Sequence, residues 1–190
     1  MMKWNDHSRL RDKHSFLSPS QSRWLRYSPE KLIQVWKSDR KKKEGTELHK
    51  LASDMINKGI SAAHKKQTFY MFVNDCIKEH MSSEVVLYYS DNAFGTADAI
   101  KVENNSLFIY DLKTGTTEAH FDQLDVYAAL YCLEYGEDPR NLQSINERLY
   151  QNNEVKTRIV DPNEIFDIMG IIVDFDRLIE RQKASTSEFN

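Results

Sequence analysis

Residues 95–115 read GTADAIKVENNSLFIYDLKTG, and this stretch decides how the rest of the chain is interpreted. Two mostly apolar segments, Gly95–Val102 and Leu107–Lys113, stand on either side of Asn104-Asn105. Asn accepts a positive φ more readily than other residues that carry a side chain, so the pair suits a two-residue turn. The stretch predicts two antiparallel strands joined by a tight hairpin.

The predicted turn sets the register of this hairpin. With the two asparagines in the turn, Glu103 pairs with Ser106. Counting outward from that pair places Asp98 opposite Asp111. Lys113 follows Asp111 by two residues and therefore projects from the same face of its strand. A register shifted by one residue would instead point the two carboxylates to opposite faces.

Two facing carboxylates in apolar strands are unfavourable unless a positive charge compensates them. One interpretation is a half-buried ion pair in which Lys113 neutralises Asp98 or Asp111. The other is a site for a hard divalent cation, which prefers carboxylate oxygens. In such a site Lys113 would act on an attacking water or on charge that develops at a phosphate. The spacing alone leaves both interpretations open.

Helical and strand patterns surround the hairpin. Periodicity and capping residues predict helices from Ser18-Pro19, from Ser28-Pro29 to Trp36, from Glu44 to Gly59, around Phe69–Ile77, from about Glu118 to Gly136, and from Asp161-Pro162 to about Gln182. The basic stretch Lys37–Lys43 separates the second predicted helix from the third. Further strands are predicted at Glu84–Tyr89, Gln143–Tyr150 and Val155–Val160. This order indicates an α/β or α+β fold built on one central sheet.

Composition indicates one domain. Of 190 residues, 40% are hydrophobic, which is enough for a core, and no apolar run is long enough for a membrane span. We expect a single domain over residues 17–183, a flexible arm over 1–16 and a disordered tail over 184–190. The N-terminus has no apolar segment typical of a secretory signal, and two cysteines favour a reducing compartment.

Charge is unevenly distributed. Residues 1–80 hold 17 Lys and Arg against 9 Asp and Glu, whereas residues 81–190 hold 9 against 20. The basic half suits a polyanion, and Lys41, Lys42 and Lys43 are its densest run. A solvated start of a helix explains the same lysines without any ligand.

Four motifs, taken in order, resemble the RecB-like exonuclease branch of the PD-(D/E)XK nuclease superfamily. The hairpin is similar to that branch's GxxD strand and the D-x-K at the end of the following strand. EGTELHKLA, residues 44–52, resembles its GT-x-x-H helix, and QLDVY, residues 123–127, resembles its Q-x-x-x-Y helix. SFLSPSQSRWLRYSPE, residues 15–30, is similar to its N-terminal signature, particularly in phage-borne members. The likeness covers about residues 15–135.

The resemblance implies a restriction-endonuclease-like core, with a central mixed sheet of about five strands flanked by helices. It implies Mg²⁺ or Mn²⁺ as the cofactor. The implied catalytic residues are Asp98, Asp111 and Lys113, and the implied metal ligands are His49, Asp98, Asp111 and the backbone carbonyl of Leu112. Residues expected to bind DNA or to orient the lysine are Gln123, Tyr127, Thr114, Lys41, Lys42 and Lys43.

Ordinary structural roles remain open for some of these residues. His49 borders an apolar stripe of its predicted helix, where a histidine can be a core residue. Gln123 and Tyr127 are four residues apart and can equally form the polar edge of a helix. Many relatives carry four cysteines that hold an iron–sulfur cluster. Here Cys76 and Cys132 fall on apolar helix stripes, so we expect two core residues and no cluster.

The resemblance implies a function in DNA metabolism. We expect a divalent-metal-dependent DNA exonuclease of phage or bacterial recombination or DNA processing. It would act in the bacterial cytoplasm, away from membranes, with a single-strand annealing or recombination protein as a partner. Two alternatives stay open at this point. One is a catalytically silent nuclease-fold module that binds DNA or protein, and the other is a structure-selective endonuclease.

Overall fold

The computed structural model describes residues 26–61, 67–115 and 117–187. The chain divides into two compact units, Met1–Thr46 and Glu47–Asn190. The predicted arm over residues 1–16 and the predicted helix start at Ser18-Pro19 lie outside the described residues. The second unit holds the sheet and the candidate site.

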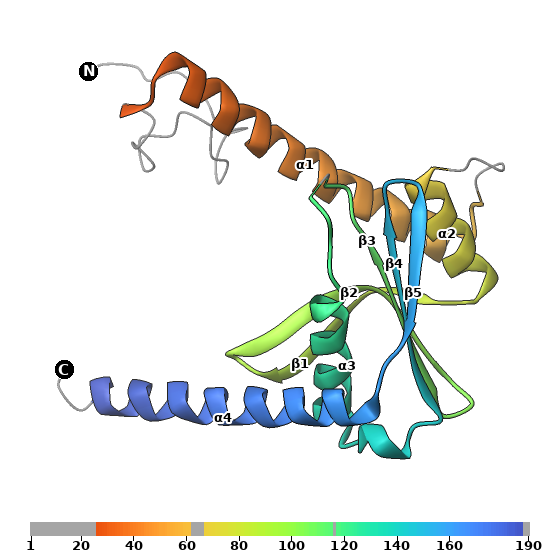
Figure 1. The fold of residues 1–190 in the computed structure, drawn as a ribbon, viewed down its shortest axis with the longest axis vertical. Helices are drawn as coiled ribbons and strands as arrows, with labels where there is room; N and C mark the ends of the chain where they lie inside the picture. Colours follow the sequence, from red (N-terminus) through yellow and green to blue (C-terminus); the bar gives the residue numbers. More distant parts are fainter. Residues whose placement is uncertain (1–25, 62–66, 116, 188–190) are drawn as a thin grey trace, which may run out of the picture. The chain divides into compact units, whose positions relative to one another are not determined.

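A five-stranded mixed sheet forms the centre of the second unit (Figure 1). Its strands are β1 (Ser82–Ser90), β2 (Ala93–Glu103), β3 (Ser106–Leu112), β4 (Ser144–Gln151) and β5 (Glu154–Ile159). They lie side by side in chain order, and every neighbouring pair is antiparallel except β3 and β4, which are parallel. The predicted α+β class with a central mixed sheet of about five strands is confirmed.

The hairpin of β2 and β3 has the predicted turn and register. Asn104 and Asn105 have φ values of 49° and 58°. Glu103 pairs with Ser106, and the same register continues outward along the two strands. A second hairpin of this kind joins β4 to β5 through Asn152-Asn153, also with positive φ values.

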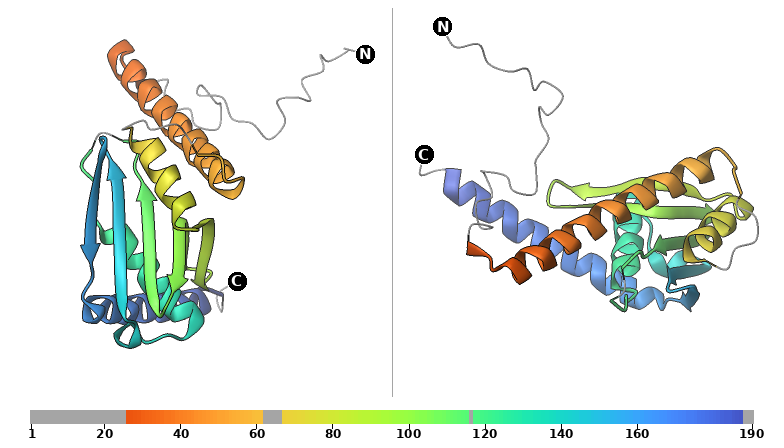
Figure 2. Two further views of the ribbon diagram at one scale, coloured as in Figure 1. Left: turned by 90° about the vertical axis from the view of Figure 1, so that its right-hand side faces the viewer. Right: turned by 90° about the horizontal axis from the view of Figure 1, so that it is seen from above.

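Helices cover both faces of the sheet (Figures 1 and 2). α2 (Thr68–Lys78) packs on β3 and β4, α3 (Asp122–Tyr135) packs on the opposite face, and α4 (Pro162–Ser187) packs against α3. A short 3-10 helix, η3 (Pro139–Asn141), precedes β4. Because α3 lies between the sheet and α4, apolar residues occur all around it rather than on one stripe.

The ends of α3 and α4 agree only in part with the predicted ends. Gly136 ends α3 in the left-handed conformation, with φ of 67°, as its position after the apolar stripe predicts. The start at Glu118 is wrong, since α3 begins at Asp122. Asp161 Oδ1 accepts the Asn163 N–H at 2.9 Å and caps the start of α4, which continues past the predicted end at Gln182.

The prediction of two helices separated by a basic stretch is wrong. The structure has one continuous helix, α1 (Pro29–Asn57), in place of a short helix ending at Trp36 and another starting at Glu44. Lys, Arg and Glu are good helix formers, and no proline interrupts residues 30–57. Gly45 costs a helix only about 1 kcal/mol relative to Ala, which a long helix tolerates.

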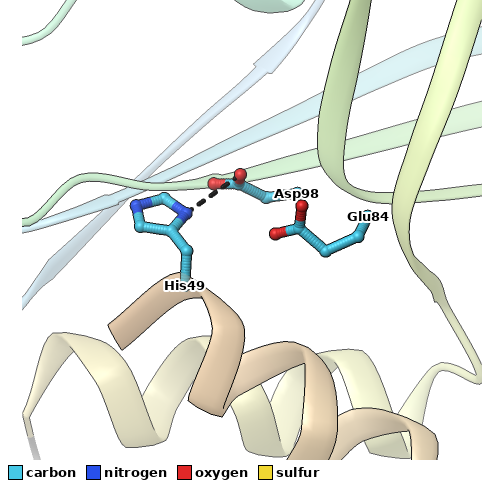
Figure 3. A group of neighbouring side chains, drawn as sticks. All are labelled: His49, Glu84 and Asp98. Carbon is cyan, nitrogen blue, oxygen red and sulfur yellow. Dashed lines mark hydrogen bonds and ion pairs between the residues drawn. The ribbon is translucent and has the colours of Figure 1, made fainter. Parts of the chain in front are cut away.

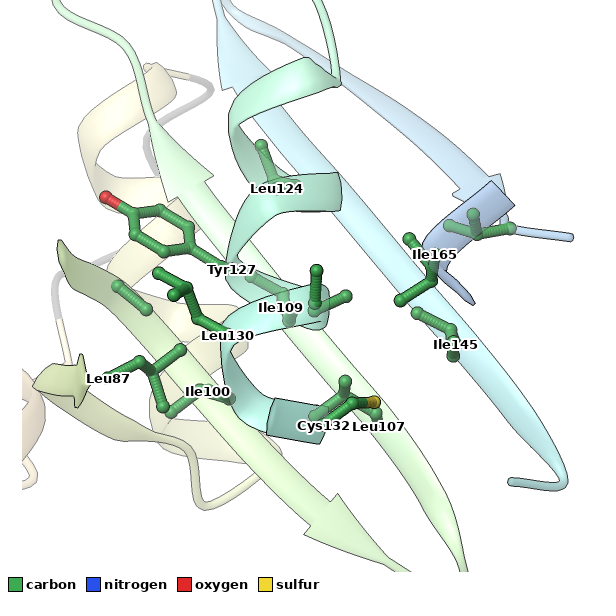
Figure 4. Packing of buried hydrophobic residues seen from close by; sticks show 14 of the residues in the cluster. Leu87, Ile100, Leu107, Ile109, Leu124, Tyr127, Leu130, Cys132, Ile145 and Ile165 are labelled. Carbon is green, nitrogen blue, oxygen red and sulfur yellow. The ribbon is translucent and has the colours of Figure 1, made fainter. Parts of the chain in front are cut away.

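Two hydrophobic clusters hold the second unit together. Figure 4 shows the larger cluster, between the sheet and α3, with residues from α4 such as Ile165. The smaller cluster joins the other face of the sheet to α2 and to Ala52 and Ile56 of α1. Cys132 belongs to the larger cluster and Cys76 to the smaller one, and both are fully buried. The prediction that they are core residues is confirmed. Burial raises the pKa of the Cys132 thiol to about 12, which keeps it protonated.

Polar contacts fasten α2 to the sheet beside the smaller cluster. Arg148 Nη1 donates to Glu79 Oε1 at 2.7 Å, and Tyr110 donates its hydroxyl to the same carboxylate. Tyr150 donates to Asp75 Oδ2 at 2.8 Å. Since buried hydroxyls are costly without partners, these bonds make α2 part of the scaffold of β3 and β4.

Among the residues that the structure describes, no helix is long and apolar enough to cross a membrane.

A second polar cluster joins α3 to β4 and β5. Arg158 donates to Asp125 and, through Nη2 at 2.8 Å, to Glu147 Oε2. Glu147 is 1% exposed, and within the described part of the chain its Oε1 has no hydrogen-bond partner. Burial raises the pKa of Glu147 to about 7, and the nearby Asp125 charge adds to this, while the Arg158 guanidinium opposes it. One guanidinium thus faces two buried carboxylates.

This cluster predicts a pH-dependent gain from Glu147→Gln. The pKa of Glu147 is above its ordinary value of 4.5, so the folded state binds the proton more tightly than the unfolded chain. Stability is therefore lost as the pH rises from about 4.5 to about 7. At pH 8 the variant should melt about 5 °C above the unaltered protein, and at pH 4.5 the two should melt together. Glu154→Gln, at an exposed β5 position, is the control. Equal effects of Glu147→Gln at both pH values would contradict the prediction.

Candidate metal centre

The candidate site lies where β2 and β3 stop pairing. The regular register ends at the pair Ala99 and Tyr110, immediately before Asp98 and Asp111. Beyond it, the Leu112 N–H donates to Asp98 Oδ2 at 2.8 Å rather than to a strand neighbour. The Asp98 carboxylate thus fills the opening between the two strands. The predicted register is therefore observed from the turn to the pair Ala99 and Tyr110, which directly precedes the two aspartates.

His49 reaches this opening from α1. Its Nδ1 lies 3.0 Å from Asp98 Oδ1 (Figure 3). Ala52 and Ile56, on the same face of the helix, are buried in the smaller cluster and hold that face against the sheet. The hydrogen bond to Asp98 raises the pKa of His49, and partial burial opposes the shift. His49 is therefore a partner of the acidic group, not a core histidine satisfied by backbone.

Asp111 is the buried member of the site, with 1% of its surface exposed. Lys113 Nζ lies 3.0 Å from Oδ2 and 3.3 Å from Oδ1. The contact with Oδ2 is an ion pair without a hydrogen bond, and no other described residue contacts this oxygen by a hydrogen bond. Burial raises the pKa of Asp111, and the Asp98 charge adds to the shift. A buried carboxylate with an unbonded oxygen beside a second carboxylate fits a cation.

A chain of side chains from α3 holds Lys113 in place. Lys113 Nζ donates to Gln123 Oε1, and Gln123 Nε2 donates to the Tyr127 hydroxyl at 2.9 Å. The four-residue spacing brings Gln123 and Tyr127 onto one helix face. Of the two roles expected for this pair, orienting the lysine is the one that these contacts favour.

Gly95 makes room for this chain. A Cβ atom at position 95 would come within 3.0 Å of the Tyr127 ring, closer than ordinary van der Waals contact. The strand that carries Asp98 therefore allows the close approach of the tyrosine that supports Gln123. Of the GxxD residues, Gly95 thus makes space for Tyr127, and Asp98 contacts His49 and the Leu112 N–H.

The loop between β3 and α3 is fixed by a residue that sequence reasoning did not single out. Buried Gln151 donates to the backbone oxygens of Gly115 and Thr117 at 2.9 and 2.7 Å, and accepts from the Ala119 N–H at 3.1 Å. Thr114 is exposed directly after Lys113. Its predicted contact with DNA stays a prediction.

Glu84 is a second residue that sequence reasoning missed. It lies on β1, and one carboxylate oxygen, His49 nitrogen and Asp98 oxygen all lie within 4.8 Å of one another (Figure 3). Desolvation raises the pKa of Glu84, followed by the Asp98 charge, while His49 lowers it. In sequence Glu84 looks like any polar residue at a strand position, because only the pairing of β1 with β2 brings it to Asp98. No local signal could have identified it.

The donor set suits a hard divalent cation. Carboxylate oxygens are the preferred ligands of Mg²⁺ and Mn²⁺, and imidazole nitrogen is accepted by Mn²⁺ and later transition ions. His49 and Asp98 are in direct contact, whereas the donor atoms that lie within 4.8 Å of one another are those of His49, Glu84 and Asp98, without Asp111; a ligand role of Asp111 stays a prediction. The N–H of Leu112 is committed to Asp98, and a role of its carbonyl as a ligand stays a prediction. The side chains of Lys41, Lys42 and Lys43 lie outside the described part of the chain, so their DNA contacts also stay a prediction.

Comparison with known proteins adds no identification. Searches against protein-family models, curated proteins and solved structures gave no match to this chain. Inference about function therefore rests on the residues and their geometry.

Proposed function

We propose that this protein is a divalent-metal-dependent phosphodiesterase that acts as a DNA exonuclease, similar to the RecB-like branch of the PD-(D/E)XK nucleases. The observation that carries the proposal is the meeting of Asp98, Asp111 and Lys113 at the end of the β2–β3 pairing. An ion pair alone would need one carboxylate. Here Lys113 contacts Asp111 and Gln123, while the second carboxylate, Asp98, contacts His49.

Each residue has a defined part in such a reaction. When bound, Mg²⁺ or Mn²⁺ would supply Lewis acidity and an activated water. Asp98, Asp111 and neutral His49 would hold the ion. Lys113, kept beside Asp111 by Gln123, would place its ammonium where negative charge grows on the scissile phosphate. Pre-organisation of that ammonium is the contribution of α3.

The test is digestion of end-labelled linear DNA beside closed circular DNA, with Mn²⁺ or with a chelator. An exonuclease releases label from linear DNA only in the presence of metal and leaves closed circles intact. Nicking or linearising of circles would instead indicate a structure-selective endonuclease. Binding of DNA without any cleavage under these conditions would indicate a silent nuclease-fold module, and the proposed reaction would be rejected.

DNA binding by the basic run gives a separate prediction. If Lys41, Lys42 and Lys43 contact phosphates, replacing all three by Ala weakens binding to every sequence. It also lowers the log–log salt slope by about one per contact. Binding is measured in chelator, so that cleavage does not interfere. A control with the same change of charge replaces Lys58, Lys78 and Lys156 by Ala. Unchanged affinity and slope would mean that the lysines are only solvated surface.

The proposed biological setting follows the same resemblance. The likeness to phage-borne members favours a role in phage or bacterial recombination or DNA processing in the cytoplasm. Its protein partner would be a single-strand annealing or recombination protein. Pull-down with a candidate annealing protein, in the presence of DNA and after its digestion, separates a protein contact from shared DNA.

A further inference from the structure

We infer that Glu84 is an additional ligand of the cation at this centre, supplied by β1 through a local distortion of the strand. The inference rests on the metal centre of the proposed function, but it concerns a residue outside the four motifs that suggested it. It names a carboxylate oxygen of Glu84 as a donor beside His49 and Asp98 (Figure 3).

The position of Glu84 follows from strand pairing. Ser83 pairs with Ala99 and Val85 pairs with Ala97, so Glu84 stands opposite Asp98. Glu84 itself has φ of 53°, which is a left-handed conformation inside a strand. A residue with a side chain adopts this conformation only at a cost in free energy. The residue with this strained backbone is the one whose carboxylate lies within 4.8 Å of the His49 and Asp98 donor atoms.

The buried oxygen of Asp111 points independently to a ligand. The Asp111 side chain is 2% exposed, and among the described residues its Oδ2 has no hydrogen bond, only an ion pair with Lys113 Nζ at 3.0 Å. Asp98 and Asp111 directly follow the last regular pair of β2 and β3, and Asp98 accepts from the N–H of Leu112, the neighbour of Asp111, so two carboxylates lie at this end of the hairpin. Asp98 and Glu84 likewise hold carboxylate oxygens within 4.8 Å of each other, where like charges repel. A divalent cation would relieve both repulsions, because Asp98, on the middle strand of the three, is the carboxylate that the other two adjoin.

The positive side chains of this site, Lys113 and His49, make their hydrogen bonds and ion pairs with residues other than Glu84. Lys113 is committed to Asp111 and Gln123, on the other side of Asp98. His49 gives its Nδ1 to Asp98. Glu84 is exposed, so its carboxylate is open to an ion from solvent. These contacts favour a ligand role over a structural ion pair.

The test uses two variants and a matched control, with Mn²⁺ as the probe. Glu84→Gln keeps the size of the side chain and removes its charge. Glu84→Gly removes the carboxylate and the strain of positive φ together. His80→Gly relieves a similar strain, at φ of 55°, in the exposed turn before β1 and away from the cluster. Mn²⁺ affinity is measured by calorimetry on metal-free protein, and thermal melting is measured in chelator.

We expect both Glu84 variants to lose at least about tenfold in Mn²⁺ affinity, as loss of a direct ligand should exceed the effect of losing a supporting residue. In chelator, Glu84→Gly should melt about 2–4 °C higher than the unaltered protein. His80→Gly should show a similar rise with unchanged Mn²⁺ affinity. The Glu84→Gly protein would thus be more stable and yet bind the ion less tightly.

Two results would overturn the inference. One is Mn²⁺ affinity in both Glu84 variants within about twofold of the unaltered protein, and the other is an unaltered protein that binds no Mn²⁺. In the first case, metal-dependent cleavage by the unaltered protein would leave the proposed function standing. Conversely, Mn²⁺ binding that depends on Glu84, without any cleavage of DNA, would support the inference and reject the nuclease proposal.

Discussion

Lys113→Met is expected to reduce metal-dependent cleavage by about a hundredfold to a thousandfold, the loss typical of removing one group that stabilises transition-state charge. Methionine keeps most of the length and apolar stem of lysine, and the position is only partly buried. The fold should therefore survive. Rates are measured on end-labelled linear DNA with saturating Mn²⁺, and circular dichroism checks the fold.

Two further variants make this test specific. Gln123→Leu leaves the lysine but removes its hydrogen bond, so an intermediate loss is expected. Lys156→Met changes the same charge at an exposed ion pair with Glu118 and should leave cleavage unchanged. Near-normal cleavage by Lys113→Met would show that the lysine is a structural ion-pair partner, and the assignment of the active site would fail.

Asp111→Asn should remove the thermal response to metal. A bound ion at a hundred times its Kd stabilises a protein by about 2.7 kcal/mol, which corresponds to a rise of about 5–10 °C for a domain of this size. The unaltered protein should show this rise with Mn²⁺. In the variant the rise should vanish, because Asp111 is a buried donor with an unbonded oxygen.

In chelator the same variant should be at least as stable as the unaltered protein. Burial and the neighbouring Asp98 disfavour the charged form of Asp111 and raise its pKa, so a neutral amide removes an unfavourable charge. Asp138→Asn, in the Arg140 ion pair away from the site, is the control and should keep the full response to Mn²⁺. An equal response in Asp111→Asn would place the ion elsewhere in the protein.

Local patterns in the chain were enough to predict the hairpin and its register. Two asparagines that accept positive φ determine where the strands reverse, and strand alternation then determines which residues face each other. The same reasoning located the C-terminal end of α3 at Gly136. The turn, the register and the end of α3 depend on residues that are close in sequence, so they can be predicted from the sequence.

Long-range contacts account for what local patterns could not predict. The continuity of α1 through its basic stretch depends on the balance between moderate propensities, which gives no sharp signal at Glu44. The late start of α3 depends on Gln151, far along the chain, which holds the preceding loop by three hydrogen bonds. Neither effect is visible within a window of a few residues.

The candidate site divides in the same way. The placement of Asp98, Asp111 and Lys113 near one end of the hairpin was predictable by sequence alone, because the turn sets the register of the two strands. Only the tertiary structure brings Glu84 beside Asp98, since β1 pairs with β2 through backbone hydrogen bonds that carry no residue-specific signal. The hold of Gln123 on Lys113 likewise depends on how α3 packs across the sheet, which is set by the apolar core as a whole.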